Sequence, residues 1–277
     1  AGATLARLAN AEHLAQREET VVDGDLLPQL AGIATTGALR IDGATGQHVS
    51  VVTGLEQAVA PAPWPPLDGG ALKDEDIRPW LLPQVYARLR QGMGDFLAEL
   101  RPTVALFVRF GGIDYDADEE AGAKLDAYIR WVQAVVARFD GTFVDLNIGD
   151  KGSYLYINFG APQAHEDNAA RAAAAALDIR TQPADLDFIG AVQIGISQGR
   201  MRAGAYGGAN HRTYGVLGDE VNMAARLMMA AKPGQILVSL AARRSMGAGF
   251  ELEELPPLRV KGKSEPAIVF ALTGEQQ

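Results

Sequence analysis

Asn222 and Arg226 are four residues apart, and their side-chain types could handle a phosphorylated substrate. In a helix, that spacing places both side chains on one face. A guanidinium presents a rigid fork of donors, which suits negative charge developing on phosphate oxygens. Taken alone, however, such an arginine is more typical of a solvated helix face. The elements and residues around the pair must therefore decide what it does.

The segments that would position this pair alternate between strand-like and helix-like patterns. β-branched and aromatic runs indicate strands, and apolar residues at helical spacing, such as Leu125, Ile129 and Val132, indicate helices. Strands are expected over 104–110, 142–148, 154–159, 189–198, 200–207, 213–217, 235–239 and 267–272, and helices over 119–139, 166–179 and 220–231. Gly204–Gly208 is interpreted as a hairpin turn, and Asp219 as a helix N-cap. This order predicts an α+β fold, with a mixed sheet whose helices cover one face.

The two ends of the chain resemble each other. Residues 2–23 match residues 218–239 at a constant offset, so that Ala9 corresponds to Ala225. The match continues into the next pair of strands after a shift of three residues. We therefore expect two copies of one unit, the first truncated at its amino end. Chance similarity between two amphipathic helix–strand segments is the alternative.

A stretch rich in proline and glycine, residues 58–79, has the composition of a linker between these copies. Apolar residues at helical spacing follow over Leu81–Arg90, and Phe96–Leu100 is expected to continue that helix. The sequence thus predicts three parts. They are a remnant of the first copy over 1–57, a proline-rich linker and helix over 58–102, and the second copy over 103–277.

Composition excludes several classes of protein. The net charge of −9 disfavours a nucleic-acid partner, because the phosphate backbone repels an acidic surface. The chain has no cysteine, so it has no disulfide framework and no thiolate zinc site. No apolar run approaches the roughly 20 residues that span a bilayer, and no signal peptide is visible. We therefore expect neither a nucleic-acid nor a membrane partner, and a cytoplasmic location.

The stretch Gly199–Arg226 resembles the class III adenylyl and guanylyl cyclases, whose pattern is a glycine-rich hairpin followed by R-x-x-Y-x-V-x-G-x-x-V-N-x-A-A-R-L. The matching residues are Arg212, Tyr214, Val216, Gly218, Val221, Asn222, Ala224, Ala225, Arg226 and Leu227, with the first arginine one position closer to the tyrosine. The resemblance covers 103–273 and is nearest to the second cyclase domain of the soluble, bicarbonate-sensitive type. It implies a ferredoxin-like cyclase sandwich, preceded by the truncated tail of a first cyclase-like domain.

The resemblance also implies roles for single residues. In the family, the asparagine that matches Asn222 orients the ribose, and the arginine that matches Arg226 binds the phosphates in the transition state. Base selection falls at Asp145 or Leu146 and at Gly215, where adenine-specific members carry a lysine and an aspartate or threonine. Because an acidic side chain before the hairpin suits guanine, the choice between ATP and GTP stays open.

The metal-binding positions of the family are altered. Two aspartates there hold two divalent ions, Mg²⁺ or Mn²⁺. The first position falls at Arg109, whose charge repels a cation, and the second falls near Asp150. We therefore expect an ion pair between Arg109 and Asp150, and we expect the ions to be held mainly by a partner domain.

Active sites in the family are shared, with the aspartates on one domain and the asparagine–arginine pair on the other. The constant offset places Ala6 and Asn10 where Asn222 and Arg226 stand, so the first copy lacks the half that the second retains. The resemblance implies a chain that supplies the Asn/Arg half of a nucleotidyl cyclase, with ATP to cyclic AMP as the favoured reaction. Its partner is an upstream cyclase homology domain or a second copy of this chain.

Two other functions remain open at this point. One is a catalytically degenerate pseudo-cyclase, kept for dimerisation or for binding a nucleotide or effector. The other is an RNA-binding sheet, which needs exposed aromatic residues on its strands and a basic face. The aromatic candidates, Phe107, Tyr154 and Tyr156, are expected to fill the core instead.

Overall fold

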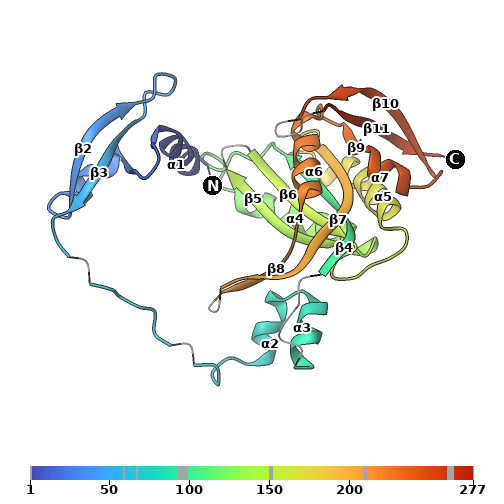
Figure 1. The fold of residues 1–277 in the computed structure, drawn as a ribbon, viewed down its shortest axis with the longest axis horizontal. Coiled ribbons are helices and arrows are strands. Elements are labelled where there is room, and N and C mark those ends of the chain that lie inside the picture. The colour runs from blue at the N-terminus through green and yellow to red at the C-terminus, as the bar shows by residue number, and fades with distance from the viewer. Residues whose placement is uncertain are drawn as a thin grey trace. The chain divides into compact units, whose positions relative to one another are not determined.

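The structure is a computed structural model. It describes residues 2–58, 60–66, 68–92, 99–149, 152–208, 211–260 and 265–276. Contacts divide the chain into two units (Figure 1). The first comprises 1–72 with 114–117 and 148–151, and the second comprises 73–113, 118–147 and 152–277. No helix in these described ranges is long and apolar enough to cross a membrane.

The second unit is built on a sheet with the strand order β10-β11-β9-β7-β4-β6-β5, and β8 pairs with β7. The strands are β4 (Glu99–Phe110), β5 (Thr142–Gly149), β6 (Gly152–Phe159), β7 (Gln193–Gly207), β8 (Arg212–Leu217), β9 (Ile236–Ser239), β10 (Phe250–Leu258) and β11 (Ala267–Glu275). The β7–β9 pair is parallel, whereas β4–β6, β4–β7 and β7–β8 are antiparallel. The expected α+β fold with a mixed sheet is therefore confirmed.

Four helices pack on this sheet: α4 (Ala121–Arg138), α5 (Asn168–Arg180), α6 (Asp219–Ala230) and α7 (Leu240–Ser245). Alternate residues of β4 point to opposite faces, which is the period of a strand. Leu106 belongs to the core with α4 and α5, whereas Phe107 belongs to the core that includes Met228 of α6. The expectation that helices cover one face is therefore wrong for α6, because β4 is apolar on both faces and both must be buried.

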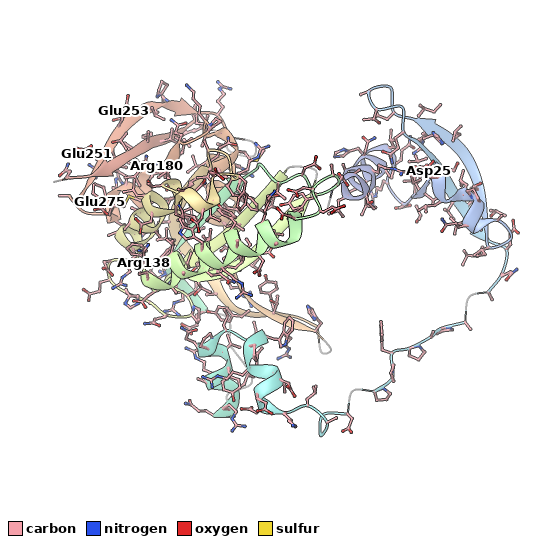
Figure 2. All side chains as sticks on the ribbon, turned by 180° about the vertical axis from the view of Figure 1, so that it is seen from behind. Asp25, Arg138, Arg180, Glu251, Glu253 and Glu275 are labelled. Carbon is pink, nitrogen blue, oxygen red and sulfur yellow. The ribbon has the colours of Figure 1, made fainter. Side chains whose placement is uncertain are left out.

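Long polar side chains join α4, α5 and β11, the strand next to one edge of the sheet. Arg138 of α4 donates to Asp178 of α5 at 2.6 Å. Arg180 of α5 donates to the carbonyl oxygens of Leu272 at 3.2 Å and Thr273 at 2.8 Å, on β11. Both arginines are labelled in Figure 2. These bonds hold the α4–α5 layer on its own face of the sheet, opposite α6.

The expected elements exist, with four differences. The two strands expected over 189–198 and 200–207 are one strand, β7, so Gly204–Gly207 is extended ladder rather than a turn. β4 already begins at Glu99, where a helix was expected; residues 93–98 lie outside the described ranges. The N-cap of α6 is Gly218, without a side-chain cap bond, so the prediction of Asp219 as the cap is wrong. β10 and α7 were not predicted.

The first unit repeats the end of the second, element by element. It contains α1 (Ala3–Leu14), β1 (Thr20–Asp23), the 3₁₀ helix η1 (Gly24–Leu30), β2 (Ala34–Ile41) and β3 (His48–Leu55). Both ends of α1 and of β1 lie 216 residues before those of α6 and β9. The strand order β1-β3-β2 parallels β9-β11-β10. The β2–β3 and β10–β11 ladders also share a register shift, after Thr35 and Glu251 respectively.

A helical segment leads into β4. It consists of α2 (Asp74–Ile77), the 3₁₀ helix η2 (Arg78–Trp80) and α3 (Pro83–Arg90), which confirms the helix expected near 81–90. Pro83 stands at the first turn of α3, where a missing backbone N–H costs nothing. Val85 is the buried residue of α3. This segment belongs to the second unit.

Candidate active site

Small residues on β7 let α6 lie directly on the strand. A Cβ at Gly195 would collide with the carbonyl oxygen of Ala224 and the amide nitrogen of Met228, both on the helix. At Gly199, a Cβ would lie 2.6 Å from Cγ of Glu220. Only glycine permits an approach this close. The backbone of α6 is therefore held at a fixed height above β7.

A part-buried hydrogen bond fixes the first turn of α6. Ser197, fully buried on β7, donates its hydroxyl to Oε2 of Glu220 at 2.5 Å. A hydrogen bond to a charged acceptor is stronger than one between neutral groups. Sequence reasoning missed these positioning residues, although the small residues at alternate positions Gly195, Ser197 and Gly199 are a signal for a closely packed helix.

Asn222 and Arg226 share one face of α6, as their spacing predicts, and that face points outward. Asn222 is exposed and Arg226 partly exposed. Both line a groove of about 410 Å³ together with residues 258–260 at the end of β10. Within the described ranges, neither side chain makes a hydrogen bond or ion pair. Their amide and guanidinium donors therefore face a concave surface that a ligand or a partner could occupy.

The candidate base-selecting residues lie on β5 and β8. Asp145 is exposed, whereas Leu146 packs against the core under α4 and α5, so Asp145 is the more available of the two. Gly215 is buried and lines a cavity of about 460 Å³ with Val144 and with residues 79–83 of the helical segment. The structure thus brings β5, β8 and the helical segment together around Gly215. Asp145 and the groove beside Arg226 do not line this cavity.

A tyrosine that sequence reasoning missed covers Gly215. The ring and hydroxyl of Tyr206 on β7 occupy the space that a side chain at position 215 would enter. The prediction of a turn over Gly204–Gly208 included Tyr206. A residue at the tip of a turn has no defined cross-strand partner, so its contact with Gly215 could not be predicted. The available signal was the lone aromatic side chain among the three glycines of residues 204–208.

Arg109 stands near the end of β4, between Tyr154 of β6 and Gln193 of β7. Its guanidinium donates to Oε1 of Gln193 at 3.4 Å. Asp150 lies outside the described residues, so the ion pair expected with Arg109 stays a prediction. No group of three or more His, Cys, Asp or Glu side chains in the described ranges could hold a metal ion. The described residues around Arg109 therefore do not fit the two-ion site that the family implies.

Phe107 and Tyr156 of the sheet are core residues, and the partly buried Tyr154 packs against the same core. Phe107 and Tyr156 are 7% and 8% exposed, and their rings stack with centroids 4.7 Å apart. Burial raises the pKa of Tyr156, whose hydroxyl donates to the carbonyl oxygen of Val216 at 3.3 Å. An RNA-binding sheet needs such rings exposed, and here they lie under α6.

The first unit has a groove of about 340 Å³ beside α1, lined by Ala6, Asn10 and the loop between β2 and β3. Here the amide nitrogen of Asn10 is engaged by its own unit. Its Nδ2 donates to Asp42 at 2.9 Å, Gln47 at 2.9 Å and Thr45 at 3.1 Å. Hydrogen bonds to Asp42, from Thr45 first, then from the backbone of Ala44 and from Asn10, lower the pKa of that carboxyl to about 2.

Comparison with known proteins agrees with this architecture. The family model of the adenylate and guanylate cyclase catalytic domain matches residues 126–274. Adenylate cyclase type 10 of Homo sapiens is 30% identical over 200 residues, which is 71% of this chain and 12% of that protein. The chain thus spans about an eighth of the length of this relative.

Solved structures share the fold. The adenylyl cyclase CyaB from P. aeruginosa matches 65% of this chain and 98% of its own, with a TM-score of 0.57 and 20% identity. The guanylate cyclase domain of RhGC from Catenaria anguillulae, in complex with GTP, matches 64% and 98%, with a TM-score of 0.56 and 24% identity. The family match covers more than half of the sequence, and the fold agrees with it. The chain therefore belongs to the adenylate and guanylate cyclase catalytic domain family.

Proposed function

We propose that residues 103–277 supply the asparagine–arginine half of a nucleotidyl cyclase active site that two domains share. In the reaction, the 3′-hydroxyl of a nucleoside triphosphate attacks its own α-phosphorus and pyrophosphate leaves, which yields a 3′,5′-cyclic nucleotide. ATP is the favoured substrate, and the product serves cyclic-nucleotide signalling. The observation that carries this proposal is the pair Asn222 and Arg226, side by side on α6 at an open groove.

The groove has the polarity that this role needs. A guanidinium with no counterion among the described residues offers its donors to phosphate oxygens, and this interaction strengthens as charge develops. In this proposal, Asn222, one helical turn away, holds the ribose. The anchoring of α6 by Ser197 and Glu220 supports the role, because a transition state is stabilised best by groups that are already oriented.

The complementary half belongs, in this proposal, to another domain. Arg109 cannot ligate a divalent cation, so Mg²⁺ or Mn²⁺ would have to arrive with the partner. We further propose that residues 1–57 are the end of a first cyclase homology domain and that 58–102 link it to the second. The matching bounds of α1 and α6, the parallel strand orders and the shared register shift support this division.

A pseudo-cyclase is the second candidate, and two observations favour it. Arg109 stands where a metal ligand is expected, and Gly215 offers no side chain to a base. On this hypothesis, the domain binds a nucleotide or effector and acts by dimerisation. The two candidates differ in one respect, since only the first predicts turnover once a metal-bearing partner is present.

The test compares this chain alone with the chain mixed with a cyclase domain that carries both metal-binding aspartates, using ATP or GTP and Mn²⁺. We expect no cyclic nucleotide from the chain alone, because every site of a homodimer would contain Arg109. We expect cyclic nucleotide from the mixture. Nucleotide binding without turnover in the mixture supports the pseudo-cyclase, and turnover by the chain alone contradicts the shared-site proposal.

A further inference from the structure

The space above Gly215 is filled by a side chain from the neighbouring strand. A Cβ built on Gly215 would lie 2.6 Å from both Cε1 and the hydroxyl oxygen of Tyr206, and 3.0 Å from its Cζ. These distances are too short for any real side chain to coexist with the ring in its present position. The phenol of Tyr206 therefore stands where the side chain of residue 215 would otherwise project.

The β7–β8 ladder explains why the ring lies there. Gly204 faces Gly215 directly across the ladder, and Tyr206 faces Thr213. The paired glycines leave a gap on one face of the two strands, and the next residue on that face of β7 is Tyr206. An aromatic ring covers such a gap well because it is flat and has few rotatable bonds. Tyr206 remains 42% exposed, so part of the residue is accessible to a ligand.

Position 215 is one of the two places where base selection falls in the proposed active site, and the present inference rests on that proposed function. A phenol can both donate and accept one hydrogen bond, and its hydrogen rotates to suit the partner. The edge of adenine presents the acceptor N1 beside its 6-amino group. A hydroxyl next to that edge can donate to N1, which an ionised carboxylate cannot do.

We propose that Tyr206 is a base-contacting residue of this cyclase domain, and that its hydroxyl donates to N1 of adenine in place of a side chain at position 215. The substrate class is thus an adenine nucleoside triphosphate, whose base Tyr206 reads while Asn222 and Arg226 hold the ribose and phosphates. Tyr206 and Gly215 act as a pair, because the ring can occupy this position only where residue 215 has no side chain.

A ligand that lacks the acceptor tests this directly. ATP and 1-deaza-ATP, in which a C–H replaces N1, are competed against a ribose-labelled fluorescent ATP on the full chain, with and without the metal-bearing domain. We expect the wild type to prefer ATP about five- to tenfold, the usual worth of one hydrogen bond. Tyr206→Phe should bring the preference close to one while leaving competition by inorganic tripolyphosphate unchanged.

Two further variants keep the test sharp. Gly215→Ala should displace the ring and reduce the preference in the same way, and adding it to Tyr206→Phe should have no further effect on the preference. Tyr86→Phe is the matched control, because it removes a phenol hydroxyl that bonds Asp74 within the helical segment; it should retain the wild-type preference.

The outcomes separate this inference from the proposed function. A wild type that binds ATP but does not distinguish it from 1-deaza-ATP overturns the role of Tyr206 and leaves the cyclase proposal intact. The same holds if Tyr206→Phe keeps the full preference. A wild type that binds no nucleoside triphosphate in either condition contradicts the proposed function, and the inference falls with it.

Discussion

α6 and α1 are the same structural element in two settings. Each is a helix of 12 residues followed by a strand of four residues, and each lines a groove with the loop or strand end that lies beside it. On α6, Asn222 and Arg226 face the groove without partners among the described residues. On α1, the corresponding residues are Ala6 and Asn10, and the amide of Asn10 is held by three side chains of its own unit.

The difference shows how one framework serves two purposes. Polar groups that are withdrawn from solvent normally find partners within the protein, as the partly buried Asn10 does. A group kept free at a concave surface gives up that stabilisation, and such exceptions are concentrated at functional sites. The groove beside α1 is stabilised by its own hydrogen bonds, whereas the groove beside α6 has donors available for a ligand. Four predictions follow from this contrast, in order of decreasing effect.

Arg226→Ala should cause the largest change. In the mixture with a metal-bearing domain, we expect the turnover number to fall about 10²- to 10³-fold, because a contact made in the transition state is lost. Asn10→Ala should leave turnover within about twofold. Arg130→Ala, which removes an exposed guanidinium from α4, is the control. Equal losses of turnover in Arg226→Ala and Arg130→Ala would contradict a special role for the groove beside α6.

Gly195→Ala should lift α6 from β7, because a methyl group there meets the backbone of the helix rather than a movable side chain. We expect the second unit to lose about 2–3 kcal/mol of unfolding free energy, measured by urea denaturation. Gly122→Ala is the matched control, since a Cβ at that position in α4 has nothing within 4 Å. If both variants unfold at the same urea concentration, the close approach of α6 has no energetic importance.

Asn10→Ala and Asn222→Ala should differ in stability. Removing Asn10 deprives Asp42, Thr45 and Gln47 of a shared donor, and we expect the first unit to lose about 1–2 kcal/mol. Asn222→Ala should change the second unit by less than about 0.5 kcal/mol, as for other surface positions. Hydrogen exchange of α1 and α6 measures the two effects separately. A loss at α6 equal to that at α1 would mean that Asn222 has a structural partner.

Lowering the pH should destabilise the residues around the groove of the first unit, and this is the smallest of the four expected effects. The pKa of Asp42 is lowered to about 2 by its hydrogen bonds, from the ordinary carboxyl value of 3.8. A lowered carboxyl pKa stabilises the fold above the unfolded value and loses that contribution as pH falls through the folded value. Protection of α1 should therefore decrease between about pH 4 and pH 2, and Asp42→Asn should flatten that decrease.

Much of the second unit could be predicted because its patterns are local. The periodicity that places Asn222 and Arg226 on one face depends on α6 alone. The position of α6 on the sheet was harder to predict from the sequence. The composition of Val104–Phe110 nevertheless indicated it. That run is apolar at every position but Arg109, so both faces of β4 had to be covered.

The remaining differences involve contacts between distant segments. Tyr206 covers Gly215 through the pairing of two strands, and the sequence alone left the register of that hairpin undefined. β10 alternates glutamate with leucine and contains two prolines, so it lacks the β-branched run that identifies a strand. It forms a strand because its backbone pairs with β11. Tertiary context here overrides the local conformational preference.

The length of β7 has a consequence for motion. Its residues 193–203 are paired with β4, but 204–207 are paired within the described residues with β8 alone. A two-stranded ribbon has one ladder to break, so it opens at lower free energy than a strand held on both sides. Backbone amides of 204–207 should therefore exchange with solvent faster than those of 193–203. The end of the strand that carries Tyr206 can therefore open locally while the end beneath α6 keeps its backbone hydrogen bonds.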